Sequence, residues 1–128
     1  MKLLLDTHII IWAVSEPTRL ARTVQQYMLN AEAMYVSAAS LWEMSIKIQL
    51  GKLHLNLSSF ILEIQNLGIL SLPITWEHAQ YTEKLPPLHK DPFDRLLIAQ
   101  AMSEPLILLT NDKALIPYHE LVKHIDSL

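Results

Sequence analysis

Short continuous apolar runs alternate along the chain with segments in which apolar residues recur every three or four positions. A continuous run is typical of a buried parallel strand, and the three-and-four spacing is typical of one face of an amphipathic helix. The runs predict strands at residues 3–5, 34–36, 70–72, 106–109 and about 121–125. The spacing predicts helices at about residues 20–31, 41–48, 60–67, 76–85 and 93–103. Strands that alternate with helices favour a mainly parallel sheet between two helical layers, a three-layer α/β/α sandwich.

Glycine and proline residues mark where several of these elements end. Gly51 and Gly68 follow two of the predicted helices, and Pro73 ends a predicted strand. The chain has 128 residues, a common length for one domain, and it contains no repeat, low-complexity tract or linker. We therefore expect a single domain over residues 1–128.

The charge balance gives no sign of a nucleic-acid-binding surface, since 13 acidic residues outnumber 10 basic ones and the net charge is −3. A role with RNA or DNA would therefore have to rest on chemistry. The absence of cysteine excludes disulfides and thiolate zinc sites and suits a reducing cytoplasm, where we expect the protein to reside. We find no stretch that would span a membrane. Apolar residues make up 51% of the chain, which indicates that part of its surface is buried against a partner.

Four carboxylates are predicted to meet at one edge of the sheet. Asp6 directly follows the first predicted strand, and Asp112 follows the fourth. Glu43 and Asp94 lie near the starts of two predicted helices. Because ligands of open parallel sheets bind beyond the carboxyl ends of the strands, we expect these side chains to lie close together. Two like charges about 4 Å apart repel by roughly 4 kcal/mol at an effective dielectric of about 20, so the cluster needs a cation or shared protons. Oxygen ligands alone favour Mg²⁺ or Mn²⁺.

Helix capping is the alternative explanation for three of these acids. Asp6 and Asp112 stand where N-cap residues are common, and the run from Ser40 to Glu43 fits a capping box. Glu43 also has Lys47 four residues later, which is the spacing of an ordinary helix ion pair. Taken one at a time, these residues do not distinguish a helix cap from a functional site.

The two aspartates in the stretch DPFDRLLIAQA differ in their position relative to the predicted helix. Asp94 shares a helical stripe with Leu97 and Ile98, so its side chain is predicted to face the interior, where a carboxylate needs a partner. Asp91 precedes Pro92, the arrangement of an N-cap residue followed by proline at the first helical position. We therefore expect Asp91 to hold the helix and Asp94 to face the site.

Other kinds of site fit the sequence poorly. His119 and His124 are five residues apart, so they point in different directions on either a helix or a strand. The sequence contains neither HExxH nor GxSxG, and its two glycines cannot form a glycine-rich phosphate loop. Trp12, Trp42 and Trp76 are interpreted as core or interface residues rather than as platforms for base stacking.

Four segments carry a resemblance to a known family, namely LLLDTHIIIWAV, VSAASLWEMSIKIQLGKL, HKDPFDRLLIAQA and LLTND. In order and approximate spacing they resemble the PIN-domain family, in particular the VapC-type toxins of bacterial toxin–antitoxin modules, over essentially the whole chain. The resemblance implies an α/β/α sandwich and metal-dependent ribonuclease activity. The family's inward acid in the helix after HKDPF corresponds to Asp94, and Asp91 is a further candidate. The implied site consists of an acidic cluster with two supporting hydroxyls, namely Asp6, Glu43, Asp94 and Asp112 with Thr7 and Thr110.

In such an enzyme, carboxylate-bound Mg²⁺ or Mn²⁺ would promote in-line attack of water on the phosphodiester and leave a 5′-phosphate. We expect Asp6, Glu43 and Asp94 to be the primary metal contacts, and Asp112 to hold a second metal or a water-mediated contact. The RNA substrate would meet the metal and a rim of basic side chains, namely Lys47, Lys52, Lys84, Lys90, Arg95 and Lys113.

The resemblance also implies two protein partners. One is a second copy of the chain in a homodimer, and the other is a small cognate antitoxin whose tail lies across the active-site groove. An arginine from that tail could bridge two carboxylates of the cluster. Two other functions remain open: a noncatalytic binding module with the same fold, and a phosphotransfer domain. The latter would need a second acid close to Asp6, where Thr7 and His8 offer none.

Overall fold

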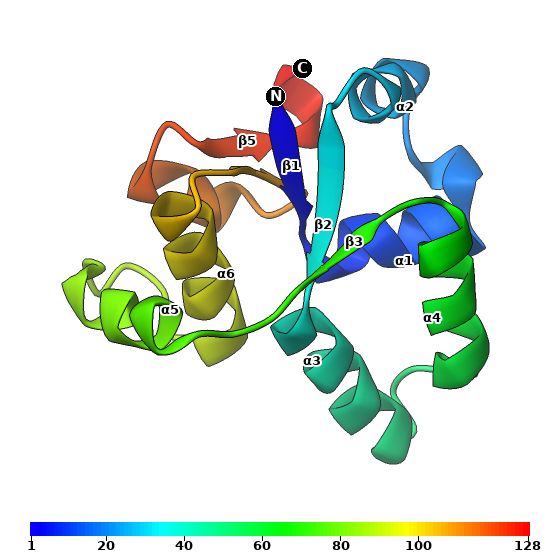
Figure 1. Ribbon diagram of the computed structural model, residues 1–128, viewed down its shortest axis with the longest axis horizontal. Helices are drawn as coiled ribbons and strands as arrows, with labels where there is room; N and C mark the ends of the chain where they lie inside the picture. The colour runs from blue at the N-terminus through cyan, green and yellow to red at the C-terminus, as the bar shows by residue number, and fades with distance from the viewer.

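The computed structural model describes residues 1–128 and contains one five-stranded sheet. Its strands are β1 (Lys2–Leu5), β2 (Ala33–Ser37), β3 (Leu70–Leu72), β4 (Ile107–Thr110) and β5 (Val122–His124). The strand order is β3-β2-β1-β4-β5, and every neighbouring pair is parallel. All five strands lie where the sequence predicts them, and the parallel sheet confirms the predicted fold class (Figure 1).

Helices flank the sheet on both sides, as the three-layer prediction requires (Figure 1). One group contains α1 (Thr7–Ser15), α2 (Arg22–Leu29) and α4 (Leu57–Asn66), and the other contains α5 (Trp76–Tyr81) and α6 (Pro92–Ser103). Helix α3 (Ala38–Gln49) extends beyond the carboxyl ends of the strands. The remaining elements are short 3₁₀ helices, namely η1 (Pro17–Arg19), η2 (Thr82–Lys84), η3 (Lys113–Tyr118) and η4 (Ile125–Ser127). None of the helices has the length and apolar content that crossing a membrane requires.

Helix α1 is the one α-helix that the sequence pattern did not single out. Its sequence THIIIWAVS is apolar on nearly every side, so it lacks the three-and-four spacing that marks a helix with one buried face. The side chain of Asp6 begins this helix by accepting a hydrogen bond from the backbone N–H of Thr7 at 2.7 Å. The N-cap interpretation of Asp6 is therefore confirmed.

Helix α3 begins earlier than predicted, and the predicted capping box at Ser40 and Glu43 is wrong. Its N-cap is Ser37, whose side chain accepts a hydrogen bond from the backbone N–H of Ala39 at 3.0 Å. Ser40 and Glu43 consequently lie inside the helix, where both meet the hydroxyl of Thr7. The carboxylate of Glu43 therefore has no capping role and lies at the end of the sheet.

The core consists of two hydrophobic clusters, and β1 contributes to both. Leu3, Leu4 and Leu5 are fully buried, and successive residues of a strand point to opposite faces of a sheet. Leu3 and Leu5 accordingly share a cluster with Phe60 of α4, whereas Leu4 shares a cluster with Leu97 of α6. Burial of each such side chain stabilises the fold by about 1.5–3 kcal/mol. This packing fixes the end of β1, and with it the position of Asp6.

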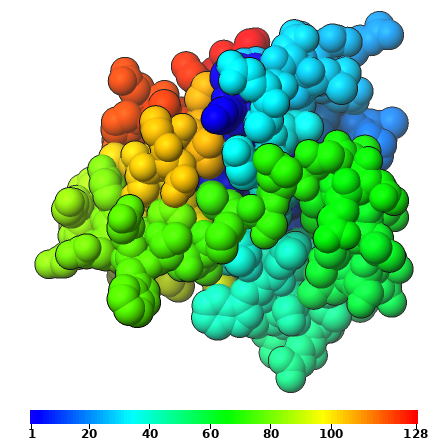
Figure 2. Space-filling view, in the orientation of Figure 1, coloured from blue at the N-terminus to red at the C-terminus, as the bar shows by residue number.

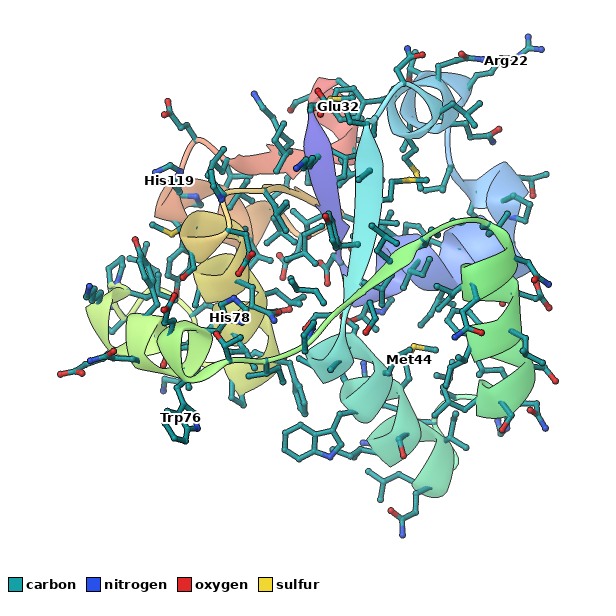
Figure 3. The ribbon with its side chains drawn as sticks, viewed as in Figure 1. Arg22, Glu32, Met44, Trp76, His78 and His119 are labelled. Carbon is teal, nitrogen blue, oxygen red and sulfur yellow. The ribbon has the colours of Figure 1, made fainter.

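Two of the three tryptophans are exposed, so for these two the predicted place in the core is wrong and the predicted place in an interface stays a prediction. Trp76 is 94% exposed and projects away from α5 (Figure 3), and Trp42 on α3 is 60% exposed. Trp12 is half-buried, with the guanidinium of Arg19 4.5 Å from the centre of its ring. In the space-filling view, α3 lies at the bottom of the molecule and the region of α5 at its left (Figure 2).

Candidate active site

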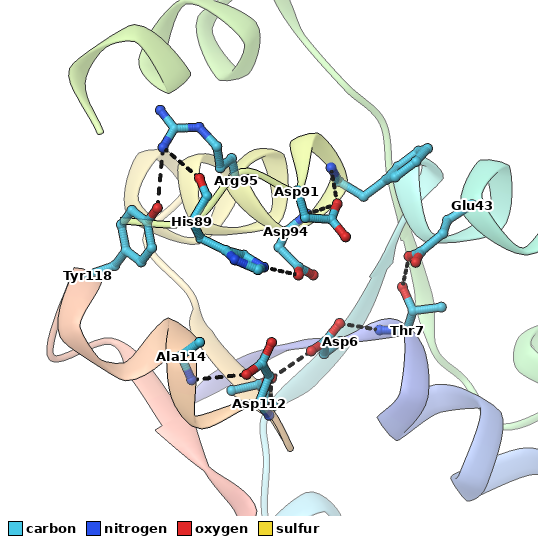
Figure 4. Close-up of polar contacts among 12 residues, drawn as sticks. Asp6, Thr7, Glu43, His89, Asp91, Asp94, Arg95, Asp112, Ala114 and Tyr118 are labelled. Atoms are coloured by element: carbon cyan, nitrogen blue, oxygen red, sulfur yellow. Dashed lines mark hydrogen bonds and ion pairs between the residues drawn. The ribbon is translucent and has the colours of Figure 1, made fainter. Parts of the chain in front are cut away.

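A cavity of about 250 Å³ lies at the carboxyl ends of β1 and β4, and no hydrophobic residue lines it. A larger cavity of about 420 Å³ lies beside β3 and α4, but no ionisable side chain lines that one. The polar cavity is therefore the candidate active site (Figure 4). It brings together all four predicted acids and a fifth carboxylate, namely Asp6, Glu43, Asp94 and Asp112 with Asp91.

Asp6 forms the floor of this cavity, and both of its carboxylate oxygens are held. Oδ1 accepts from the backbone N–H of Thr7, and Oδ2 accepts from the hydroxyl of Thr110 at 2.6 Å. Burial raises the pKa of the Asp6 carboxyl above its ordinary value, although the hydrogen bonds from Thr110 and Thr7 lower it in part. Asp6 is therefore both a helix cap and a buried carboxylate of the cavity.

The hydroxyls of Thr7 and Thr110 connect the acids. These are the two hydroxyls that the family resemblance implies as supporting groups. Thr7 Oγ1 donates to Glu43 Oε1 at 2.8 Å and joins α1 to α3. Thr110 Oγ1 donates to Asp6 and accepts from the backbone N–H of Asp112 at 3.0 Å, which joins the ends of β1 and β4. Each hydroxyl thus fixes a carboxylate that lies far away in the sequence.

Asp94 points into the cavity from the first turn of α6. Its Oδ2 lies 2.9 Å from Nε2 of His89. The pKa of Asp94 is raised to about 6. Burial is the largest cause of this rise, and the negative charge of Asp6 is the next. Asp91 contributes further to this rise, whereas the contact with His89 opposes it. Like charges are therefore crowded at this point of the cavity.

Asp91 and Asp112 combine capping with a place in the cavity. Asp91 Oδ1 accepts from the backbone N–H groups of Phe93 at 2.8 Å and Asp94 at 3.3 Å, which confirms the predicted N-cap of α6. Asp112 Oδ1 likewise accepts from Ala114 N–H at 2.9 Å and caps η3. Both residues also line the cavity. Capping and lining the site are therefore not exclusive, and the position of Asp91 does not separate it from Asp94 as sharply as the sequence suggested.

His89 is one of three cavity side chains that sequence reasoning missed. It stands five residues before Asp94 in a segment without regular structure, so no periodic pattern points to it. Single ligand atoms of His89, Asp94 and Asp112 all lie within 4.8 Å of one another. The signal available in the sequence is a histidine directly before a capped helix that carries an inward acid. His8 and Asn111 also line the cavity.

The predicted basic rim is largely not assembled around the cavity. Lys47 lines it, but its Nζ lies 3.1 Å from Glu43 Oε2, which confirms the predicted helix ion pair. Arg95 instead donates to backbone carbonyls of the segment before α6 and to the hydroxyl of Tyr118 at 3.2 Å. Lys84 lies over the ring of Tyr81. The other predicted cations are exposed side chains that do not line the cavity, namely Lys52, Lys90 and Lys113.

The donor set of this cavity fits a divalent cation. Five carboxylates surround it, whereas Lys47 is the one lysine or arginine that lines it. Hard cations such as Mg²⁺ and Mn²⁺ prefer carboxylate oxygens, and they relieve the repulsion between crowded acids. Burial raises the pKa values of Asp6 and Asp94, and repulsion from neighbouring carboxylates raises them further.

Comparison with known proteins agrees with this geometry. The family model described as the PIN domain matches residues 3–119. The chain belongs to the PIN-domain family. The sequence matches no curated protein.

Two solved structures share the fold of this PIN domain. A chain of VapBC2 from Rickettsia felis, crystallised with a DNA fragment from its promoter, has a TM-score of 0.70 at 16% identity. The match covers 97% of each chain. A chain of DNA-bound VapBC from Salmonella typhimurium has a TM-score of 0.67 at 17% identity, with 97% of this chain and 96% of that chain covered. At such identities the likeness is one of fold.

Proposed function

We propose that this PIN domain is a metal-dependent endoribonuclease that acts as the toxin of a toxin–antitoxin module. One observation carries the proposal: five carboxylates from distant parts of the chain converge on a single cavity without hydrophobic lining. Such a cluster is costly unless a cation neutralises it, and phosphodiester hydrolysis is a reaction that carboxylate-held metals promote. The family match and the two VapBC structures of the same fold support the choice of a toxin nuclease.

Asp6, Glu43 and Asp94 would hold the metal, and Asp112 would hold a second ion or a water-mediated contact. When bound, Mg²⁺ or Mn²⁺ supplies Lewis-acid stabilisation of the phosphodiester and makes water a better nucleophile. The chain itself supplies orientation. Thr110 and the N–H of Thr7 hold the two oxygens of Asp6, so this carboxylate is aligned before any ligand arrives.

The ion pair of Glu43 and Lys47 would affect the charge of the cavity that both residues line. Lys47 partly neutralises Glu43 and lines the cavity, where it can meet a phosphate of the RNA. Asp94 is half-buried and crowded by Asp6, so a metal would favour its ionised form. Hydrolysis in this arrangement would leave a 5′-phosphate and a free 3′ hydroxyl.

A cleavage assay tests this function. Purified protein freed of any antitoxin should cleave a labelled structured RNA in the presence of Mg²⁺ or Mn²⁺ and stop when EDTA is added. Protein carrying Asp94→Asn, prepared in the same way, controls for contaminating nucleases. Cleavage that continues unchanged in chelator, or that is equal in the variant, contradicts the proposal.

We extend the proposal to two protein partners and to a cytoplasmic location. The antitoxin partner is supported by the fold shared with VapBC assemblies, and an arginine from its tail would fit the excess of carboxylates in the cavity. A homodimer is supported by large apolar side chains that are exposed on the single chain, such as Trp42 on α3 and Trp76 on α5.

The partners can be tested separately from the activity. Light scattering at micromolar concentration should give twice the mass of the chain, and Trp76→Ser should shift the equilibrium toward monomer. A strict monomer contradicts the dimer. A small gene directly upstream should encode a protein that co-purifies with the chain and stops cleavage, and its absence weakens the antitoxin proposal.

A further inference from the structure

His89 enters the acidic cavity from the irregular segment between η2 and α6, and Arg95 of α6 holds that segment in place. The guanidinium of Arg95 donates to the carbonyls of Thr82 at 3.1 Å and Pro86 at 3.0 Å, and more weakly to that of His89 at 3.4 Å. Arg95 directly follows Asp94 in the sequence. The same turn of α6 therefore presents Asp94 to the cavity and fixes the backbone that carries His89.

The nitrogen of His89 lies where a metal ligand would lie. Nε2 is 2.9 Å from Oδ2 of Asp94, and donor atoms of His89, Asp94 and Asp112 are all within 4.8 Å of one another. In a six-coordinate ion with bonds of about 2.1 Å, adjacent ligand atoms are about 3 Å apart and opposite ones about 4.2 Å. The spacing of these three side chains thus matches a shared ion after shifts of a few tenths of an ångström.

His78 of α5, which contacts Glu104 at the C-terminal end of α6, is an example of a structural pair of histidine and carboxylate. His78 is buried, its Nδ1 accepts from the backbone N–H of Thr75, and its Nε2 contacts Glu104. Both of its nitrogens are therefore occupied. His89 makes one side-chain contact, to a carboxylate that already has an excess of negative neighbours, and its ring lines the open cavity.

We propose that His89 is a nitrogen ligand of a metal ion in this PIN domain, namely the ion that Asp112 would hold, with Asp94 as the further ligand. The centre then has a mixed nitrogen and oxygen donor set, which favours Co²⁺ and other transition-metal ions over Mg²⁺ more than carboxylates alone would. The inference rests on the proposed carboxylate metal centre. It adds His89 to the ligands of that centre, and it adds a preference for transition-metal ions that oxygen ligands alone would not give.

Electron spin echo spectroscopy of the protein loaded with Mn²⁺ tests the inference directly. A coordinated imidazole gives ¹⁴N modulation of the Mn²⁺ signal, so the unaltered protein should show it and His89→Gln should lose it. His8→Gln is the matched control, because His8 is the other histidine that lines the cavity. His54→Gln, at an exposed position outside the cavity, controls for stray binding. Both controls should keep the modulation.

Calorimetric titration gives a second readout. His89→Gln should weaken Co²⁺ binding by about tenfold and change Mg²⁺ binding by less than about threefold. Thermal unfolding of the same samples identifies a variant that has not folded, in which case His89→Asn replaces it.

The outcomes separate this inference from the proposed function. If no Mn²⁺ binds the unaltered protein, the proposed metal centre and the role of His89 both fail. If Mn²⁺ binds without ¹⁴N modulation, or if the modulation survives in His89→Gln, only the role of His89 fails. Equal losses of Co²⁺ and Mg²⁺ affinity would also overturn the proposed metal preference.

Discussion

The two ends of α6 each carry a pair of histidine and carboxylate, and the pairs differ in their surroundings. At the first turn, His89 Nε2 lies 2.9 Å from Asp94 in a cavity lined by five carboxylates. At the last turn, His78 Nε2 lies 2.5 Å from Glu104, the C-cap residue of the helix. His78 also accepts from the backbone of Thr75 in a capping box, so it ties α5 to α6.

A histidine–carboxylate pair alone therefore does not mark a functional site. Glu104 is 38% exposed and keeps contact with water, so its charge is tolerated with one partner. Asp94 is more enclosed and faces the charges of Asp6 and Asp91 as well. An uncompensated excess of carboxylates, drawn together from distant segments, is what distinguishes the candidate active site from a structural contact.

The largest expected effect is on catalysis. Asp94→Asn keeps the shape of the side chain but removes a charge that would bind metal, so we expect RNA cleavage to fall by about 100-fold or more. Glu104→Gln, at the other end of α6, is the matched control and should cleave at close to the original rate. Initial rates with labelled RNA measure both. Full activity of Asp94→Asn would show that the catalytic cluster is wrongly assigned.

The second-largest expected effect is on the pH dependence of stability, which should differ between the two ends of α6. The pKa of Asp94 is raised to about 6, so between about pH 4 and pH 6 the folded protein binds more protons than the unfolded chain. Stability therefore falls as the pH rises through this range. Asp94→Asn removes the penalty and should stabilise the metal-free protein by roughly 2–3 kcal/mol at pH 7.5, at about 1.4 kcal/mol per pKa unit.

Urea unfolding in EDTA at several pH values checks this expectation. The gain from Asp94→Asn should shrink as the pH falls and approach zero below about pH 3, where the carboxyl is protonated in both states. Glu104→Gln serves as the control and should show no comparable gain. A gain that is independent of pH would mean that relief of charge crowding is not its cause.

At the structural end of α6, the expected effect is on folding alone. His78→Ala removes a buried ring, one half of a capping box and the contact with Glu104, so it should cost about 2 kcal/mol of unfolding free energy. Cleavage per folded molecule should be unchanged. Chemical denaturation and RNA cleavage on the same sample measure the two effects, and His54→Ala at an exposed position is the control. A selective loss of activity would contradict the structural role.

The smallest effect concerns Asp91, which caps α6 and also lines the cavity. Asp91→Ala should cost about 1 kcal/mol of stability, whereas Asp91→Asn should cost little because asparagine is also a good N-cap. Thermal or urea unfolding measures this difference. Cleavage by Asp91→Asn then decides the second question: loss as complete as that of Asp94→Asn, in a folded protein, would place Asp91 among the catalytic residues.

Features that depend on residues close together in the chain could be predicted from the amino-acid sequence. Continuous apolar runs located all five strands, and the three-and-four spacing located five of the six α-helices, because periodicity records which residues share a buried face. The cap at Asp91 was equally readable, since an N-cap bonds within its own first turn. The positions of Asp6 and Asp112 after parallel strands already predicted that these two acids would meet.

Contacts between groups that are distant in the sequence became visible in the fold alone. Thr7 reaches Glu43 across 36 positions, and Thr110 reaches Asp6 across 104. His89 joins the acids because Arg95 anchors an irregular segment, a contact that no local pattern contains. Periodicity shows which side of an element is buried, but the partner of that side depends on how separate helices pack on the sheet. Individual contacts at the carboxyl ends of the strands, such as that between Thr7 and Glu43, therefore follow from the packing, and local sequence cannot specify them.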